Sequence, residues 1–151
     1  MFRQTLLAAC AVLCVGAASA QALPAPGYDA TLAKSLGGDD RGMHAYVLVI
    51  LKTGPNKMPE GEARSRMFQG HFANIERLAA DKKLALAGPL DGVGGLRGIF
   101  IFATDDIEQA KAFVAADPVI INGEMVAEYH KFYGSAGLMA VNDIHNKIRK
   151  K

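Results

Sequence analysis

The stretch AYVLVIL, residues 45–51, is an unbroken apolar run that is rich in β-branched residues and is followed by the turn pair Gly54-Pro55. A run of this length without polar alternation predicts a strand that is buried on both faces. A second stretch, GIFIFA at residues 98–103, has the same character. The sheet that contains these two strands must therefore be covered on both sides.

The segments around these strands complete a βαββαβ order. Residues 60–83 predict a long helix, because apolar residues recur there at spacings of three and four. Residues 84–87 and 125–133 predict two further strands, and residues 107–116 predict a second helix. This order is that of the ferredoxin-like fold, with both helices on one face of a four-stranded sheet. We therefore predict an α+β domain, to which residues 137–150 add a C-terminal helix.

The central strands leave a second apolar face of the sheet without a cover. Soluble monomers rarely expose so large an apolar surface. Two such faces that pair about a twofold axis would remove it from water, and the strand pattern therefore predicts a homodimer. The C-terminal helix is the competing cover for the same face.

The N-terminal residues have the features of a targeting segment. Arg3 precedes an apolar run that is too short to span a bilayer and that leads to the A-x-A site of residues 18–20. We expect a signal peptide over residues 1–20, export to the periplasm or medium, and no membrane span after cleavage. The alternative is a lipoprotein that is acylated at Cys10, because LAAC at residues 7–10 resembles a lipoprotein box.

The length of 151 residues and the net charge of +2 suit one globular domain behind this segment. Residues 21–43 are expected to form a linker with a short helix, residues 44–136 the α+β domain, and residues 137–151 the last helix with a basic tail. No basic cluster is long enough to predict a nucleic-acid partner.

Cofactor and metal sites are not expected in the mature domain. Both cysteines, Cys10 and Cys14, fall in the signal segment, so a disulfide, a thiolate nucleophile and a cysteine-ligated metal are excluded downstream of it. The remaining His, Asp and Glu residues show no metal-ligand spacing. The glycine-rich residues 92–95 join two strands, so they predict a hairpin turn rather than a dinucleotide loop.

One histidine and one aspartate are the main candidates for chemistry. The expected inner stripe of the long helix consists of Met67, Phe68, His71, Phe72, Ile75, Leu78 and Ala79. His71 is therefore either a hydrogen-bonded core histidine or a general acid or base, since imidazole titrates near neutral pH. Asp117, which stands before Pro118, either caps a turn or accepts a hydrogen bond from His71 and fixes its tautomer.

Three further residues are candidates for substrate contacts. Arg97 begins the third strand and could hold an anionic group, although a charge at that position is also typical of a solvated strand entrance. His130 and Tyr133 lie on the last strand, three residues apart, and are expected on opposite faces. A structural role is the alternative for both.

Several segments together resemble the YciI-like (YCII-related) family: YVLVILK at 46–52, GHFANI at 70–75, LAGP at 86–89, RGIFIF at 97–102, and DP at 117–118 with Gly123. The resemblance implies a dimeric α+β barrel of the ferredoxin-like type. It also implies an active site built on one histidine and one aspartate, here His71 and Asp117. Members include a dehydrochlorinase that acts on a chlorinated hydroxyhydroquinone, and the fold resembles that of muconolactone isomerase.

The chain departs from the family pattern at one helix position. Many relatives have an arginine three residues before the histidine, whereas this chain has Phe68, and Arg64 and Arg66 are expected at other helical angles. Any anion-binding role of that arginine is therefore not carried over.

Two classes of function remain open. The first is a small cofactor-independent lyase or isomerase, in which His71, oriented by Asp117, moves a proton on a small cyclic or aromatic substrate. The second is a non-catalytic periplasmic dimer that binds a small ligand. A fold kept only as a dimerising scaffold is a third possibility.

Overall fold

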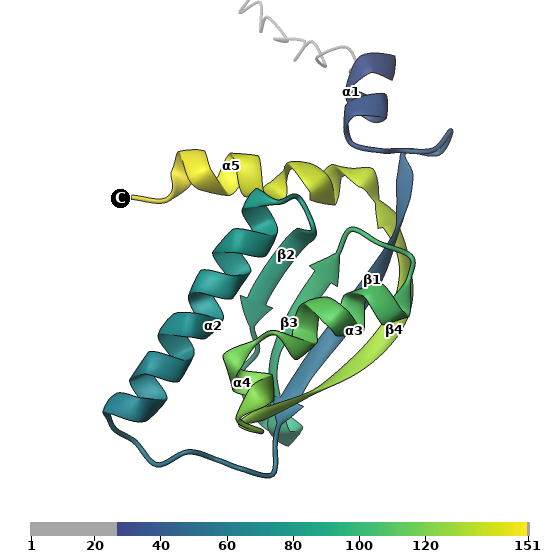
Figure 1. Cartoon of the computed structure of the whole chain (residues 1–151). Helices are drawn as coiled ribbons and strands as arrows, with labels where there is room; N and C mark the ends of the chain where they lie inside the picture. Colours follow the sequence, from purple (N-terminus) through teal and green to yellow (C-terminus); the bar gives the residue numbers. More distant parts are fainter. Residues whose placement is uncertain (1–26, 151) are drawn as a thin grey trace, which may run out of the picture.

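Residues 27–150 are described by a computed structural model, so the predicted signal segment with Cys10 and Cys14 lies outside the described residues. The elements follow the predicted order (Figure 1). They are α1 (Ala30–Ser35), β1 (Met43–Thr53), α2 (Glu62–Ala80), β2 (Leu84–Pro89), η1 (Val93–Gly95), β3 (Leu96–Phe102), α3 (Ile107–Ala115), α4 (Pro118–Ile121), β4 (Met125–Ser135), η2 (Ala136–Ala140) and α5 (Val141–Ile148).

The four strands form one antiparallel sheet in the order β2-β3-β1-β4. The two apolar stretches that predicted doubly buried strands are the two central strands, β1 and β3. The main core lies between the sheet and the helices α2 and α3, where Val47 and Val49 of β1 and Phe102 of β3 are fully buried. The α+β prediction is therefore confirmed, with both helices on one face (Figure 1).

A short helix that the sequence did not predict, α4, follows Asp117. The Asp117-Pro118 pair was expected to end the second helix, and α3 does end at Ala115. Proline, however, also suits the first turn of a helix, because its missing N–H has no partner to lose there. Pro118 therefore begins α4, and the chain makes one more helical turn before β4.

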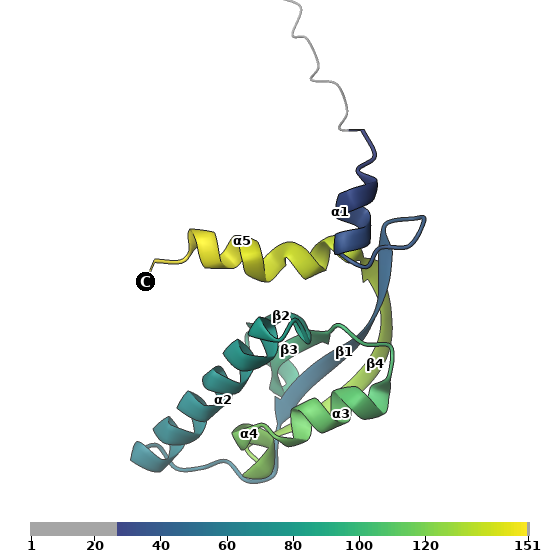
Figure 2. The same cartoon turned by 45° about the horizontal axis from the view of Figure 1, so that its top comes forward.

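The second face of the sheet is partly covered by the C-terminal segment. Tyr46 and Ile101 are buried there against Leu138 and Met139 of η2. Figure 2 shows α5 on the side of the sheet opposite to α3. Several apolar side chains on this face remain only partly buried, and we call four of them the open-face patch: Leu48, Ile50, Leu86 and Ile99. The C-terminal segment, which was the alternative to a dimer partner, therefore covers one end of this sheet face.

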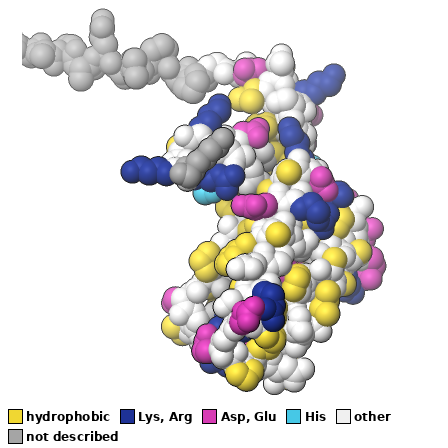
Figure 3. Space-filling view, turned by 60° about the vertical axis from the view of Figure 1, so that its left-hand side comes forward, with side chains coloured by type: hydrophobic (Ala, Val, Ile, Leu, Met, Phe, Trp, Pro, Cys, Tyr) yellow, Lys and Arg dark blue, Asp and Glu magenta, His cyan; other side chains and the backbone are white. Residues whose placement is uncertain are grey.

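Figure 3 views the molecule from the side on which α2 and the C-terminal end lie, and shows separate hydrophobic patches among charged side chains. Within residues 27–150, no helix is both long enough and apolar enough to cross a membrane.

A buried carboxylate fastens the loop between β1 and α2 to the start of β4. Glu124 is fully buried, and its oxygens accept hydrogen bonds from the Met58 backbone N–H at 2.7 Å and from Arg64 Nη2 at 2.8 Å. Burial alone raises the pKa of Glu124, but the hydrogen bonds from Arg64 and Met58 and the nearby positive charges outweigh it and hold that pKa below its ordinary value. A Cβ at Gly54 of the loop would collide with the carbonyl oxygen of Gly123, so the two backbones touch directly.

We expect the Glu124→Gln variant to lower the free energy of unfolding at pH 7 by about 2 kcal/mol, because it removes a charge-assisted hydrogen bond and the buried partner of Arg64. The folded-state pKa lies below the unfolded one, so the carboxylate stabilises the fold above the unfolded pKa, and this contribution is lost as the pH falls through the folded pKa. The gap between wild type and variant should therefore shrink below about pH 4. Urea unfolding across this pH range measures it.

The matched control is Glu128→Gln, which removes the exposed ion pair between Glu128 and Lys52. Exposed pairs contribute little to stability, so this variant should unfold almost as wild type does. Equal losses in the two variants at pH 7, or a gap for Glu124→Gln that persists undiminished in acid, would contradict the role given to Glu124.

Candidate active site

The helix α2 and the residue before α4 bring a histidine and an aspartate into contact. His71 is only 6% exposed and Asp117 is fully buried. The His71 ring nitrogen Nδ1 lies 2.9 Å from each carboxylate oxygen of Asp117. An ionised carboxylate can only accept hydrogen bonds, so Nδ1 carries the proton in this contact. In the neutral ring, Nε2 is then the nitrogen with a free lone pair.

Asp117 also caps a helix. Its Oδ1 accepts from the backbone N–H of Val119 at 3.1 Å, which makes Asp117 the N-cap of α4. Its Oδ2 accepts from Nδ2 of Asn74 at 3.1 Å. The two contacts that the sequence left as alternatives, the cap and the bond to His71, are both present. The cap and Asn74 hold the carboxylate, and the carboxylate in turn holds the imidazole ring.

Close packing of α2 against α4 brings these residues together. A Cβ at Gly70 would lie 2.9 Å from Cγ of Pro118, which is closer than non-bonded carbon atoms normally approach. Glycine at this position therefore lets the backbone of α2 lie directly against Pro118. His71 follows Gly70 and Asp117 precedes Pro118, so this backbone contact lies next to the hydrogen bond.

A cavity of about 500 Å³ opens beside His71, between α2 and the strands β2 and β3. Its volume is in the range of small-molecule sites, and its lining is mostly apolar. The rings of Phe68, Phe72 and Phe100 have centroids 6.1, 5.4 and 6.0 Å from that of His71. Phe72 was expected in the buried stripe of α2, and this is wrong: it is 59% exposed and contributes to the cavity wall from outside the core.

The His71 side chain is part of the wall of this cavity. Among the buried side-chain nitrogen and oxygen atoms of residues 27–150, only Nε of Arg64 lacks a hydrogen-bond partner. His71 Nε2 makes no hydrogen bond to another described residue, so it is not sealed inside the protein. A histidine that is held through one nitrogen and accessible through the other has the geometry of a general acid or base.

Arginines approach the site from two elements. Arg97 of β3 lines the cavity. Arg64 of α2 does not line it, but its guanidinium carbon lies 4.9 Å from the centroid of the Phe68 ring. Arg64 was expected at a different helical angle from position 68, yet it reaches the Phe68 ring, because residues four apart are neighbours on a helix surface.

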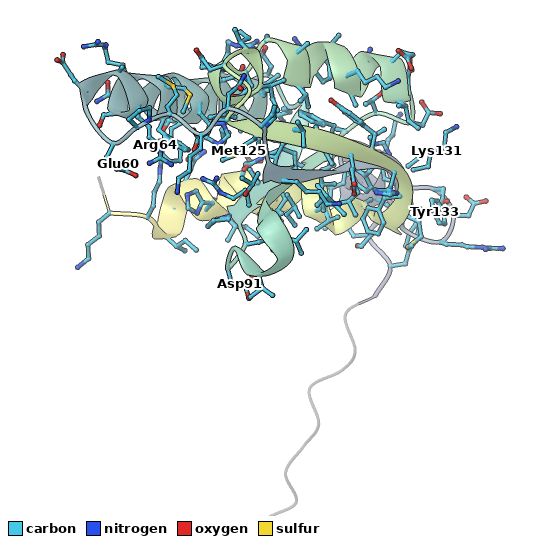
Figure 4. The ribbon with its side chains drawn as sticks, turned by 90° about the horizontal axis from the view of Figure 1, so that it is seen from below. Glu60, Arg64, Asp91, Met125, Lys131 and Tyr133 are labelled. Atoms are coloured by element: carbon cyan, nitrogen blue, oxygen red, sulfur yellow. The ribbon has the colours of Figure 1, made fainter. Side chains whose placement is uncertain are left out.

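The other two predicted contact residues lie elsewhere. The register of β4 pairs His130 with Leu48 and Tyr133 with Ala45, so the two side chains are on opposite faces, as expected from their spacing. Neither lines the cavity. The hydroxyl of Tyr133 donates to Asp39, which raises the pKa of Tyr133 and lowers that of Asp39. Figure 4 shows Tyr133 at one end of the domain, well away from Met125, which does line the cavity.

Two partners in this region were not predicted from the sequence. Asn74 could have been found, because it lies three residues after His71 and therefore on the same side of α2. Glu124 had no such signal, since a glutamate next to a glycine turn is typical of a solvated loop end. In the described part of the chain, no three potential metal ligands gather at one point.

Comparisons with known proteins identify the family of the chain. Uncharacterized protein YjpA of Bacillus subtilis (strain 168) is 26% identical over 81 residues, which cover 54% of this chain and 85% of that protein. The sequence profile of the YCII-related domain matches residues 45–132, a segment that runs from β1 to β4 and includes both His71 and Asp117. Because this match covers more than half of the chain, the protein belongs to the YCII-related domain family.

Proposed function

We propose that the protein is a small cofactor-independent lyase or isomerase, in which His71 moves a proton on a small cyclic or aromatic substrate. The observation that carries this proposal is the state of the His71 ring: Nδ1 is held by Asp117 at 2.9 Å, Nε2 has no hydrogen-bond partner among the described residues, and the side chain lines a cavity of about 500 Å³. One fold can carry many unrelated functions, so the function depends on this site and not on the fold.

The proton transfer follows from the hydrogen bonds. Nε2 removes a proton from a ring carbon next to an electron-withdrawing group, and the imidazolium that forms keeps its Nδ1–H on the Asp117 carboxylate. In an isomerisation, Nε2 returns the same proton to another carbon. In an elimination, the electron pair of the broken C–H bond forms a double bond as the leaving group departs, and Nε2 later gives its proton to water.

The cavity wall suits a ring-shaped substrate. Phe68 and Phe100 offer aromatic faces near His71, and aromatic side chains pack favourably against other rings. An apolar wall also strengthens the electrostatic interaction between the imidazolium and Asp117, because little water screens it. The same aromatic wall favours a second candidate function, a binder that holds such a ligand without turnover.

We expect His71→Gln and Asp117→Asn to lower turnover about 100-fold or more. The first variant removes the base. The second keeps an oxygen for the cap of α4 but turns an N–H toward the ring, which favours the wrong tautomer. Proton NMR in D₂O measures turnover and ring-proton exchange on a panel of cyclic enones, unsaturated lactones and chlorinated hydroxyhydroquinones.

His145→Gln is the matched control, because His145 is exposed on α5 and outside the cavity. This variant should turn over the panel as wild type does. A folded His71→Gln protein with wild-type turnover would overturn the proposed chemistry. If panel members raise the melting temperature of the wild type but none of them undergoes turnover or ring-proton exchange, the non-catalytic binder is favoured.

We also propose that two copies associate through the open-face patch. Its support is the apolar character of the patch and its partial burial, because Ile50 and Ile99 lie outside the cluster that η2 joins. Ile50 and Ile99 lie opposite each other on the two central strands, in the middle of the sheet.

A lysine in the patch should therefore prevent association. Sedimentation equilibrium is expected to give twice the chain mass for wild type and a single chain mass for Ile50→Lys, since a charge buried in an apolar interface is costly. Ile121→Lys is the control, because Ile121 is 68% exposed on α4, away from the sheet. A monomeric wild type, or a dimer that tolerates Ile50→Lys, would contradict this interface.

Export of the chain is proposed on the sequence of residues 1–20 alone. N-terminal sequencing of protein from a periplasmic fraction is expected to begin at Gln21. A chain that keeps its first residues in the cytosol would contradict cleavage, and a lipid attached at Cys10 would show the lipoprotein alternative instead.

A further inference from the structure

We propose that the cavity selects a small ring-bearing monoanion, and that Arg97 binds its carboxylate. This inference deepens the proposed function and rests on it for the site, because it concerns the cavity that His71 borders. It names the class of ligand and a specificity residue, neither of which follows from the contact between His71 and Asp117.

The charges around the cavity favour an anion. Of the described side chains that line it, only His71 and Arg97 can carry a charge, and none is acidic. A guanidinium is always protonated near neutral pH. In a mostly apolar wall, where water screens weakly, such a charge attracts an anion and repels a cation more strongly than it would on the surface.

Arg97 makes no side-chain hydrogen bond to another residue in the described range. Among residues 27–150, its one ion pair is with Glu124, whose Oε1 lies 3.7 Å from Arg97 Nη1. This distance is too long for a hydrogen bond. The side chain is 23% exposed, so it is neither buried away nor fully solvated. Its hydrogen-bond donors can therefore serve a ligand, and their planar fork matches the two oxygens of a carboxylate.

Glu124 interacts only weakly with Arg97 because its oxygens already accept hydrogen bonds from other groups. Arg64 Nη2 binds the same Oε1 atom at 2.8 Å, and the Met58 N–H takes the other oxygen at 2.7 Å. One buried carboxylate thus faces two guanidinium groups. The second acidic partner of Arg64, Glu60, is 83% exposed, so water screens its charge. The buried carboxylate of Glu124 therefore does not fully neutralise the two arginines, and Arg97 retains positive charge that a ligand can compensate.

The positions of Arg64 and Glu124 make them positioning residues for Arg97. Figure 4 shows Met125 between Arg64 and Tyr133 and nearer to Arg64, and Met125 is part of the cavity wall. Glu124 attracts the Arg97 guanidinium to this wall without binding it tightly. Arg64 itself is held by Glu124 and by its stacking on Phe68, and it does not line the cavity.

The single guanidinium group of Arg97 determines the class of ligand. A carboxylate carries one charge and two coplanar oxygens, which one guanidinium can neutralise and bind. A dianion such as a phosphate monoester would keep an uncompensated charge against an apolar wall, which is costly. With the carboxylate on Arg97 of β3, the attached ring occupies the apolar remainder of the cavity, whose wall includes Phe68, Phe100 and His71.

The test compares benzoate with benzamide, which has nearly the same shape and no charge. Titrations of ¹⁵N-labelled protein at pH 7 measure both affinities from backbone amide shifts around the cavity. We expect benzoate to bind about tenfold more tightly than benzamide to wild type. Arg97→Gln should lose this preference, and Arg97→Lys, which keeps the charge without the planar fork, should retain part of it.

Arg66→Gln is the matched control, because Arg66 pairs with Glu62 on the exposed side of α2 and does not line the cavity. It should keep the full preference for benzoate. Equal affinities of benzoate and benzamide for wild type, no binding of benzoate, or a preference that persists in Arg97→Gln would each overturn the assignment.

The result is independent of turnover. His71→Gln is expected to keep the preference for benzoate, because it removes the base and leaves Arg97 in place. A benzoate preference without turnover of any panel member would support Arg97 and count against the lyase or isomerase. Turnover of uncharged substrates, together with equal affinities for benzoate and benzamide, would support the lyase or isomerase and count against the role of Arg97.

Discussion

The buried carboxylate of Asp117 is the constraint around which the site is arranged. A charge that is removed from water must be compensated by hydrogen bonds, or the fold loses several kcal/mol. Asp117 meets this need with donors from both sides, His71 and Asn74 of α2 and the Val119 N–H of α4. The two helices therefore cannot separate without exposing an unpaired acid in the core. The same requirement orients the imidazole ring toward the cavity.

A second buried acid, Glu124, also connects α2 to the rest of the domain, at the other end of α4. Asp117 precedes this short helix and Glu124 follows it, so both carboxylates lie on the connection between α3 and β4. Asp117 binds the middle of α2, whereas Glu124 binds Arg64 near its beginning. The long helix is thus attached at two points along one side. The cavity opens between that helix and the sheet.

The sequence predicted the fold through its strongest patterns and missed features that depend on tertiary contact. The apolar stretches at 45–51 and 98–103 became the central strands, because a doubly buried strand has few other possible positions. The place of His71 on α2 followed from helical periodicity. Phe72 has the same periodicity yet is mostly exposed, since the stripe is wider than the part of the sheet that α2 covers. Glu124 could not be predicted, because its partners Met58 and Arg64 are far away in the sequence, and α4 was missed because an Asp-Pro pair can end one helix or begin the next.

The contact between Gly70 and Pro118 bears on how this kind of site could be transferred or altered. The separation of the imidazole and the carboxylate depends on two backbones that touch, and not only on the conformations of two side chains. Grafting a histidine and an aspartate onto another scaffold would therefore reproduce the chemical groups without their spacing. A designer would need to copy the glycine–proline contact as well, and a search for functional analogues among unrelated folds could use that backbone approach as its geometric signature.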